Sequence, residues 1–381
     1  MQIHFQADPS LDALISRLNE LKASNPKLES VLIWAAEGNQ WSVDALNQQL
    51  PQLPLTLLGG IFPQIIYEQR NLTTGCILVT FETSLPWIAI ESLSQGMSAH
   101  LDTLATTAEH WEDHSGCTTL LNLVDGLSSG ISEWISEVFN QFGLENNILG
   151  GGAGSLSLVQ TPCLITPKGL LMDAGLLIRL PWCSGLGVSH GWEPISAPYK
   201  VTQSHKNTVE QLDWKPAFDV YRQTVEMHSQ QTFADQAFFD LAKAYPFGIS
   251  KLDAELIVRD PLAQTPDKAL VCVGDVPEGC FVRILNGTPK SLIEAAAQAS
   301  QSARANYQKN HAASADALVL IDCISRVLFL GQRIEEEFQA INPKSQPLFG
   351  ALTLGEIANN GQDYLEFYNK TAVVAVISAQ G

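Results

Sequence analysis

The stretch DALVLIDCISRVLFLGQRIEEEFQAI, residues 316–341, runs directly into NPKSQPLFGALTLGEIANNGQDYLEFYNKTAVVAVI, residues 342–377, and together they outline one structural unit. The aliphatic run 317–321 has the pattern of a strand that is buried on both faces. Residues 332–341 have the one-sided apolar spacing of a helix, with the carboxylates of residues 335–337 facing outward. A second apolar piece then ends on glycine, and a last apolar run closes the stretch. We therefore predict a strand-helix-strand-turn-strand unit.

The same order of elements occurs twice earlier in the chain. The first copy covers residues 31–37, 42–50, 55–60 and 75–81, and the second covers residues 118–125, 131–142, 148–152 and 175–180. In each copy the first strand ends on an acid and the second on a glycine, separated by 22, 25 and 28 residues in the pairs Glu37 and Gly59, Asp125 and Gly150, and Asp322 and Gly350. Because the spacing varies, the pattern fits either a true structural repeat or the ordinary alternation of strands and helices.

Length and composition predict two folded domains. A chain of 381 residues exceeds one ordinary hydrophobic core, and its 45% apolar content is typical of a folded protein. The polar, proline-containing segment 194–216 marks the boundary, which divides the chain into residues 1–205 and 206–381. The predicted fold class is α/β (mixed α+β), with two domains built from these units and mixed sheets flanked by helices.

Charge and hydropathy limit the partners. The chain has 40 acids and 22 bases, a net charge of -18, and no basic stripe, which argues against binding to nucleic acid or to an anionic membrane. The N-terminus lacks the basic start and apolar stretch of a signal peptide. The longest apolar region, residues 169–188, is interrupted by Asp173, Arg179 and Pro181, so no membrane insertion is expected. We predict a cytoplasmic protein.

The seven cysteines are expected to be reduced. They are odd in number, never form a CxxC pair, and stand mostly in apolar runs. One of them, Cys117, follows His110 and His114, whose spacing places both imidazoles on one face of a helix. The order HWEDH is not HExxH, however, and a solvated helix end explains it more simply. No metal site is therefore predicted.

The strand end at Asp322, Cys323 and Arg326 is the first candidate site. Loops that follow buried strands carry ligand contacts in open α/β sheets. Arg326 is suited to holding a carboxylate through two parallel hydrogen bonds, and a thiol beside a cation is more readily ionised. The alternatives are a packed cysteine and a surface ion pair, and a nucleophilic Cys323 lacks a histidine within its own unit.

Two further segments complete the candidate set. Gly355 and Glu356, together with Asn369, bracket the last hairpin, where Glu356 either accepts from a ligand amine or caps the turn. The segment Gly150-Gly151-Gly152 either lets backbone amides approach a ligand or forms a tight turn between packed elements. Its spacing is neither GxGxxG nor GxxxxGK[ST], so no nucleotide or other cofactor is predicted.

Several of these motifs resemble the FIST family. GWEPISAPYKVTQSHKNTVEQLDWKPAFDVY, residues 191–221, looks like the end of the N-terminal FIST domain, although Ser196 and Trp214 stand where that family usually has glycine. The C-terminal half is similar to the FIST C domain in the motifs YPFGI (245–249), VRDP (258–261), VPEG (276–279), Cys323 with Arg326, Gly355 with Glu356, and Asn369 with Thr371.

The resemblance implies a FIST N-like domain at residues 1–205 and a FIST C-like domain at 206–381. It also implies a sensory module that binds small ligands such as amino acids. We therefore expect a small polar ligand in a cleft between the domains and a signalling protein partner in trans. The alternatives are a cysteine-dependent enzyme that uses Cys323 with His190 or His205 as base, and a ligand-free adaptor or scaffold.

Overall fold

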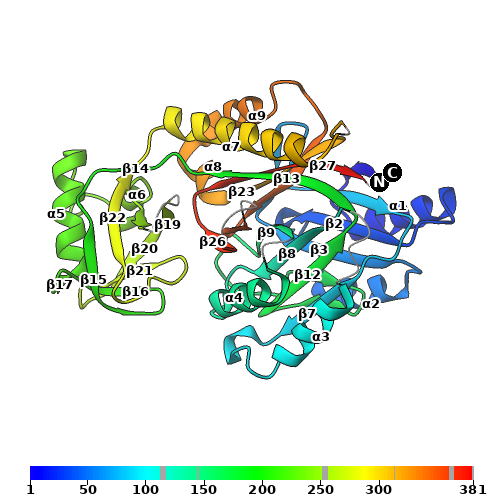
Figure 1. The fold of residues 1–381 in the computed structure, drawn as a ribbon, viewed down its shortest axis with the longest axis horizontal. Coiled ribbons are helices and arrows are strands. Elements are labelled where there is room, and N and C mark those ends of the chain that lie inside the picture. Colours follow the sequence, from blue (N-terminus) through cyan, green and yellow to red (C-terminus); the bar gives the residue numbers. More distant parts are fainter. Residues whose placement is uncertain (112–116, 144–145, 251–255, 313, 360–363, 380–381) are drawn as a thin grey trace.

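A computed structural model describes residues 1–111, 117–143, 146–250, 256–312, 314–359 and 364–379 of the chain. Three six-stranded sheets form a large body, and a nine-stranded sheet forms a smaller domain, at the left of Figure 1. All four are built with helices packed beside them, which confirms the predicted mixed α/β class. Among the described residues, no helix is both long and apolar enough to cross a membrane.

The strand-helix-strand-turn-strand unit occurs three times in the large body. The first unit consists of β2 (Ser30–Ala36), α2 (Val43–Gln49), β3 (Thr56–Phe62) and β6 (Cys76–Phe81). The second consists of β8 (Thr119–Asp125), α4 (Ile131–Phe142), β9 (Asn147–Ala153) and β12 (Ala174–Leu180). The third consists of β23 (Ala317–Cys323), α8 (Ile324–Leu330), α9 (Ile334–Ile341), β24 (Leu348–Thr353) and β27 (Ala372–Ala379). Each first strand pairs in parallel with the second and antiparallel with the last. The repeat is therefore a true one.

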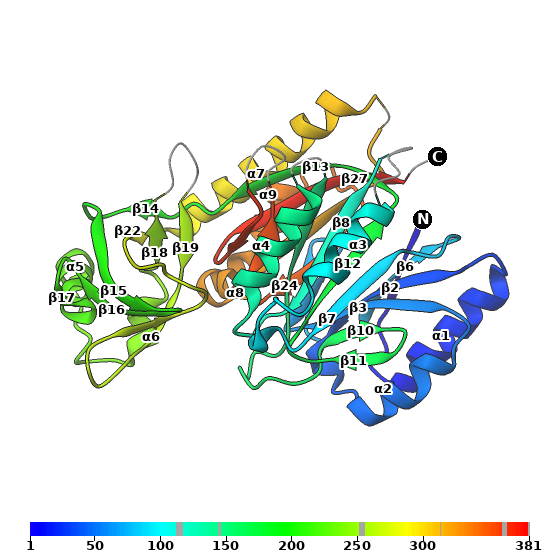
Figure 2. The ribbon, with the colours of Figure 1, turned by 60° about the horizontal axis from the view of Figure 1, so that its bottom comes forward.

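A strand and a helix precede each unit. The pairs are β1 (Gln2–Gln6) with α1 (Leu11–Ser24), β7 (Trp87–Glu91) with α3 (Leu101–Trp111), and β13 (Trp182–Ser189) with α7 (Pro289–Asn310). Each of these strands pairs antiparallel with the last strand of its own unit. Figure 2 shows α7 running along β13 and β27 on the outside of the large body. Short 3-10 turns cover Glu37–Asn39, Leu50–Gln52, Leu93–Gln95 and Gly331–Arg333.

Hairpins link the three sheets into a ring. They are β4 (Gln64–Tyr67) with β5 (Arg70–Leu72), β10 (Leu164–Thr166) with β11 (Gly169–Leu171), and β25 (Glu356–Ala358) with β26 (Glu366–Tyr368). Each hairpin leaves its own unit and adds to the second strand of another, so that β4 joins β24, β10 joins β3 and β25 joins β9. The sheets share one core, in which the Phe349 ring meets Trp34 and Trp182 edge-on.

Glycine occupies the same place in all three units. Gly59, Gly150 and Gly350 lie opposite Ile33, Asn122 and Leu320 on the parallel first strand. A Cβ atom on these glycines would lie 2.0, 1.8 and 1.8 Å from the carbonyl oxygen of that partner, so no other residue fits. The acids are not equivalent in this register, because Glu37, Asp125 and Asp322 stand four, three and two residues beyond those partners.

The smaller domain is inserted between β13 and α7, the strand and helix that precede the third unit. Its elements are β14 (Glu193–Pro194), β15 (Tyr199–His205), β16 (Thr208–Leu212), β17 (Lys215–Pro216), α5 (Ala217–Ser229), α6 (Phe238–Ala242), β18 (Phe247–Ile249), β19 (Ile257–Arg259), β20 (Pro261–Gln264), β21 (Leu270–Cys272) and β22 (Phe281–Asn286). The boundary expected between residues 205 and 206 falls at the turn joining β15 to β16. From α7 onward, the chain returns to the large body.

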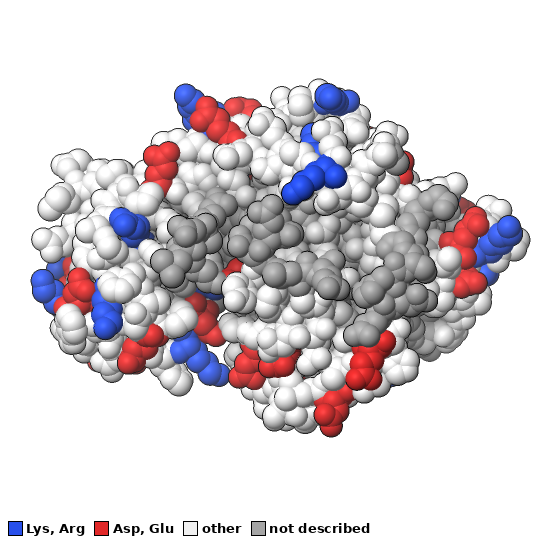
Figure 3. Space-filling view, viewed as in Figure 1, with Lys and Arg blue, Asp and Glu red and all other residues white. Residues whose placement is uncertain are grey.

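The charged side chains are dispersed over the surface. On the face shown in Figure 3, the described lysines and arginines stand singly among the acids instead of gathering in one patch. This dispersion agrees with the lack of a basic stripe in the sequence.

Candidate functional site

The predicted residues at the end of β23 form a buried polar cluster around Arg326, which is fully buried in the first turn of α8. The Nε group donates to Glu337 at 3.1 Å and lies 3.3 Å from the Asp322 carboxylate, and one Nη2 hydrogen also goes to Glu337. The remaining donors reach the backbone carbonyls of His190, Leu292 and Lys370 at 2.8, 2.9 and 3.1 Å. Arg326 thus ties α7, α9 and the β26–β27 turn to the end of β23.

These contacts give Arg326 a positioning role. All five of its N–H groups are engaged, so a direct bond to a ligand carboxylate would require one of them to be released. Burial disfavours the charge, but the carboxylates of Glu337 and Asp322 outweigh it and raise the pKa of Arg326. Glu337 itself is fully buried, which corrects the expectation that it faces outward.

Glu356 and Cys323 form the second part of the cluster. The Glu356 carboxyl group accepts from Thr353 Oγ1 at 3.0 Å and from the Thr371 amide at 3.2 Å. Burial raises the pKa of Glu356 to about 8, so this group holds a proton at neutral pH. Burial also raises the pKa of Cys323, which disfavours the thiolate that a cysteine nucleophile needs. The cluster therefore gives the cysteine-dependent enzyme no support.

The raised pKa of Glu356 predicts a pH dependence of stability. From pH 4.5 to about 8 the folded chain holds a proton that the unfolded chain releases. The contribution of Glu356 to the free energy of unfolding is thus complete below pH 4.5 and declines as the pH rises to about 8. Urea denaturation at both ends of this range should show a smaller decline in Glu356→Gln than in the native chain. The exposed Glu336, changed to glutamine, should leave the decline unchanged.

Lys370 connects the cluster to the smaller domain. Its Nζ atom lies 2.9 Å from Asp260 Oδ2, donates to the Lys243 carbonyl at 2.9 Å, and stands 5.2 Å from the centre of the Trp192 ring. In the opposite direction, Arg259 of the smaller domain donates to the Phe367 carbonyl at 2.8 Å. Buried cations therefore join the two bodies, and the cluster lies at their junction.

Some polar atoms at this junction lack hydrogen-bond partners. Within the described part of the chain, they are both amide atoms of Asn369, Asp322 Oδ2 and Asp260 Oδ1. All three side chains are nearly or fully buried, and Asn369 is 2% exposed. Buried polar atoms are almost always paired in folded proteins, and exceptions mark strain, bound water or a ligand. The junction thus combines buried charge with unused hydrogen-bonding capacity.

The predicted glycines lie in the frame of the cluster. Gly150, Gly151 and Gly152 belong to strand β9, not to a loop or turn, and Gly151 pairs with Glu356 of β25. A Cβ on Gly152 would lie 2.4 Å from the Leu354 carbonyl oxygen. Gly355 has φ 93° and lies against the Phe367 ring, where a Cβ would come within 2.2 Å. Close approach of strands accounts for glycine at these positions.

Other candidate positions are placed as follows. His110 is exposed on α3 and its ring lies 2.6 Å from the Thr106 carbonyl, whereas His114 lies outside the described residues. His205 is exposed at the end of β15 in the smaller domain.

The surface has two hollows, of about 580 and 640 Å³. The first is lined by residues 226–236 near the end of α5, and the second by residues around Tyr67 and Gln346. Neither hollow includes a predicted site residue.

Fold and site define a mixed α/β protein of two bodies, in which an interlocked three-sheet body carries an inserted domain held by a buried ion pair and by a hydrogen bond from a buried arginine. The model of the FIST N domain matches residues 36–215, and that of the FIST C domain matches residues 217–359. The chain belongs to the FIST family, as its sequence motifs predicted. The large body contains segments of both matches, since β13 lies in the first and β23 in the second. A search of curated proteins found no match.

Proposed function

We propose that this chain is a sensory module that binds a small polar ligand of the amino-acid or carboxylate class at the junction of its two bodies. The FIST family is associated with sensing and signal transduction, which supports the general role. The observation that carries the proposal is the group of unpaired buried polar atoms on Asn369, Asp322 and Asp260. A ligand that pairs these atoms would be stabilised by the same physics that penalises leaving them unpaired.

The chemistry of these atoms defines the ligand. Burial raises the pKa of both Asp322 and Asp260, and the Lys370 charge opposes this shift at Asp260. The unpaired oxygen of Asp260 therefore accepts from an ammonium group, a protonated Asp322 also donates, and the Asn369 amide both donates and accepts. A zwitterion or a small carboxylate with a donor group meets both needs. Among the predicted site residues, Asp322 and Asn369 would contact the ligand, and the surrounding frame would consist of Cys323, Arg326, Gly355, Glu356 and Gly150–Gly152.

Signalling would follow from the position of Lys370. Its ion pair with Asp260 spans the two bodies, so an ammonium group bound at the unpaired Oδ1 atom would share the carboxylate with Lys370 and weaken this ion pair. Binding would then favour a different arrangement of the smaller domain, provided that the ligand has unequal affinity for the two arrangements. A signalling protein in trans would recognise one of them.

A thermal-shift screen against amino acids and small carboxylates tests this function. A ligand at a hundred times its Kd should stabilise the folded chain by about 2.7 kcal/mol. Asn369→Leu should leave the unliganded chain as stable as the native one or more stable, because the amide has no partner to lose, but it should abolish the shift.

Asn359 provides the matched control. It is also buried, but its side chain accepts from the Ile148 amide at 2.9 Å and donates to the Asn146 carbonyl at 2.8 Å. Asn359→Leu should therefore cost about 1–3 kcal/mol for each backbone group left unpaired. A ligand shift that survives in Asn369→Leu would refute the site, and no shift with any compound would favour the ligand-free adaptor.

A further inference from the structure

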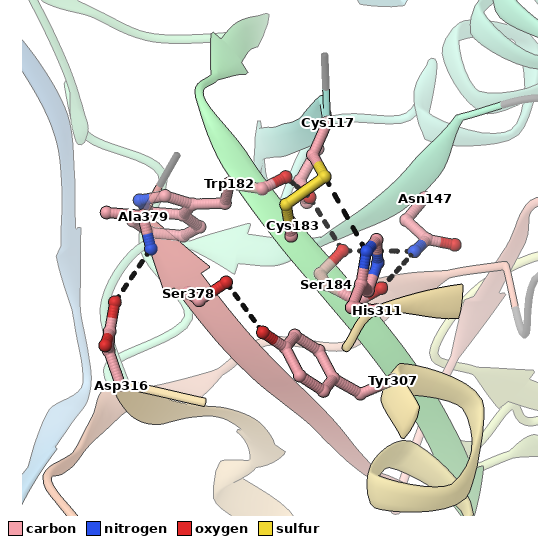
Figure 4. Close-up of a disulfide and its surroundings, with 11 residues drawn as sticks. Cys117, Asn147, Trp182, Cys183, Ser184, Tyr307, His311, Asp316, Ser378 and Ala379 are labelled. Carbon is pink, nitrogen blue, oxygen red and sulfur yellow. Dashed lines mark hydrogen bonds between the residues drawn. A yellow bond between two sulfur atoms is a disulfide. The ribbon is translucent and has the colours of Figure 1, made fainter. Parts of the chain in front are cut away.

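A second cluster lies apart from the junction, between the second and third units. Cys117 precedes β8, Cys183 is the second residue of β13, and His311 caps the C-terminus of α7. Cys117 and Cys183 are joined in a disulfide, so the expectation that all cysteines are reduced is wrong for this pair. The Cys117 Sγ atom lies 3.7 Å from His311 Nδ1, and Figure 4 shows the imidazole facing the two sulfur atoms.

The two cysteines are held close by contacts other than the disulfide. Thr119 Oγ1 donates to the Trp182 carbonyl at 2.9 Å and lies 2.6 Å from Ser184 Oγ. Asn147 Nδ2 donates to the Ser184 carbonyl at 2.8 Å. These bonds hold Thr119, two positions after Cys117, against both neighbours of Cys183, so breaking the sulfur–sulfur bond leaves the two thiols near each other.

The imidazole is also held in place. His311 ends α7, and its backbone amide donates to the Tyr307 carbonyl at 2.9 Å. The two rings of Tyr307 and His311 have centres 4.9 Å apart, and the Tyr307 hydroxyl donates to Ser378 Oγ at 2.7 Å. A disulfide by itself requires no histidine, whereas two thiolates with an imidazole are the ligands that zinc prefers.

We propose that Cys117, Cys183 and His311 form a redox-controlled zinc site. In the reduced chain, the two thiolates and the imidazole bind Zn²⁺, and water takes the fourth position. Zinc bonds of about 2.3 Å to sulfur and 2.0–2.1 Å to nitrogen place tetrahedral sulfur and nitrogen ligands about 3.6 Å apart. The Cys117 Sγ to His311 Nδ1 distance of 3.7 Å matches this spacing, and all three ligand atoms lie within 4.8 Å of one another.

Oxidation expels the metal. A low-molecular-weight disulfide accepts one thiolate, releases its first thiol, and leaves a mixed disulfide on the chain. The second thiolate then attacks the chain's own sulfur of that mixed disulfide, which forms the Cys117–Cys183 bond and releases the second thiol. Two electrons pass from the cysteines to the small disulfide, two protons from solvent complete the thiols, and Zn²⁺ leaves because neither sulfur remains a thiolate. The structure represents this oxidised state.

Zinc binding to the full chain tests the proposal. The chain is reduced, freed of reductant and metal, and titrated with Zn²⁺ against a chromogenic chelator. We expect about one tight zinc ion per chain, none in Cys117→Ser or Cys183→Ser, and affinity reduced more than about tenfold in His311→Ala, since even second-shell changes at zinc sites cost 10- to 100-fold. Treatment of the zinc-loaded chain with glutathione disulfide should release the zinc and remove two titratable thiols.

Cys280→Ser is the matched control. Cys280 is also half-buried but free, and it lies in the smaller domain, so its replacement should leave zinc binding unchanged. Thermal melting verifies that each variant is folded. Zinc binding by the native chain also tests the proposal without any variant. A reduced chain that binds no zinc, or that retains zinc after the two thiols are oxidised, would overturn it.

Discussion

Replacing Arg326 with leucine is expected to lower the free energy of unfolding by about 3–5 kcal/mol, which is enough to unfold many domains. The change leaves the carboxylate of Glu337 and three backbone carbonyls without their donor in a fully buried site. Urea denaturation followed by circular dichroism measures the loss. Arg333→Leu is the control, because Arg333 pairs with Glu336 in a half-exposed ion pair whose loss should change the stability little.

A double substitution tests the cause of this loss of stability. If the buried charge of Glu337 is what destabilises Arg326→Leu, then adding Glu337→Leu should recover part of the lost stability, since a buried carboxylate without a partner is removed. Equal stability of the Arg326 and Arg333 variants would show that the cluster does not hold the third unit together.

Gly150→Ala should prevent folding of the large body. The added Cβ would lie 1.8 Å from the Asn122 carbonyl oxygen, and β9 has no room to move because β8 and β25 flank it on both sides. We expect a loss greater than about 4–5 kcal/mol, a size that only a severe steric or polar defect produces. The yield of soluble chain and its thermal melting curve measure the effect.

Gly279→Ala distinguishes the effect of steric overlap from the effect of replacing a glycine that has room for a Cβ atom. Gly279 has φ 85°, and no atom lies within 4 Å of the position that its Cβ would take. Its replacement should therefore cost only the left-handed backbone penalty of about 1–2 kcal/mol. A Gly150→Ala chain that melts close to the Gly279→Ala chain would contradict the account of glycine in the second strand of each unit.

Local sequence pattern predicted the elements because it records burial directly. The aliphatic runs of β2, β8 and β23 are buried along their whole length, and their periodicity is visible without any partner. The glycines of the repeat were also visible. Their physical cause, the carbonyl oxygen of the neighbouring parallel strand, was not visible, because it depends on strand pairing.

Partners distant in sequence could not be predicted. The pairing of β4 with β24 joins residues more than 270 positions apart, and an apolar strand pattern does not specify which strand it will meet. The Cys117–Cys183 pair was hidden for the same reason, since 66 residues separate the two cysteines. Lys370 and Asp260 meet only because the inserted domain folds back against the third unit.

The candidate site was predicted in part. Asp322, Cys323, Arg326 and Glu356 do converge at the end of β23, where an α/β sheet commonly places polar groups. The prediction that Glu337 faces outward was wrong, and the reason lies in its position on the helix. It stands three residues after Ile334 and four before Ile341, on the buried face of α9, but the run of three acids made it resemble its exposed neighbours.

The exchange of hairpins among the sheets also has a consequence for biosynthesis. As the chain leaves the ribosome, β9 emerges about 200 residues before β25, and the interval between β4 and β24 is longer still, so both strands have an unpaired edge during translation. Each six-stranded sheet contains a hairpin from another unit, so no unit completes its sheet from its own residues. A nascent chain released before residue 348 would therefore lack both β24 and β25, the strands that cover the edges of β4 and β9.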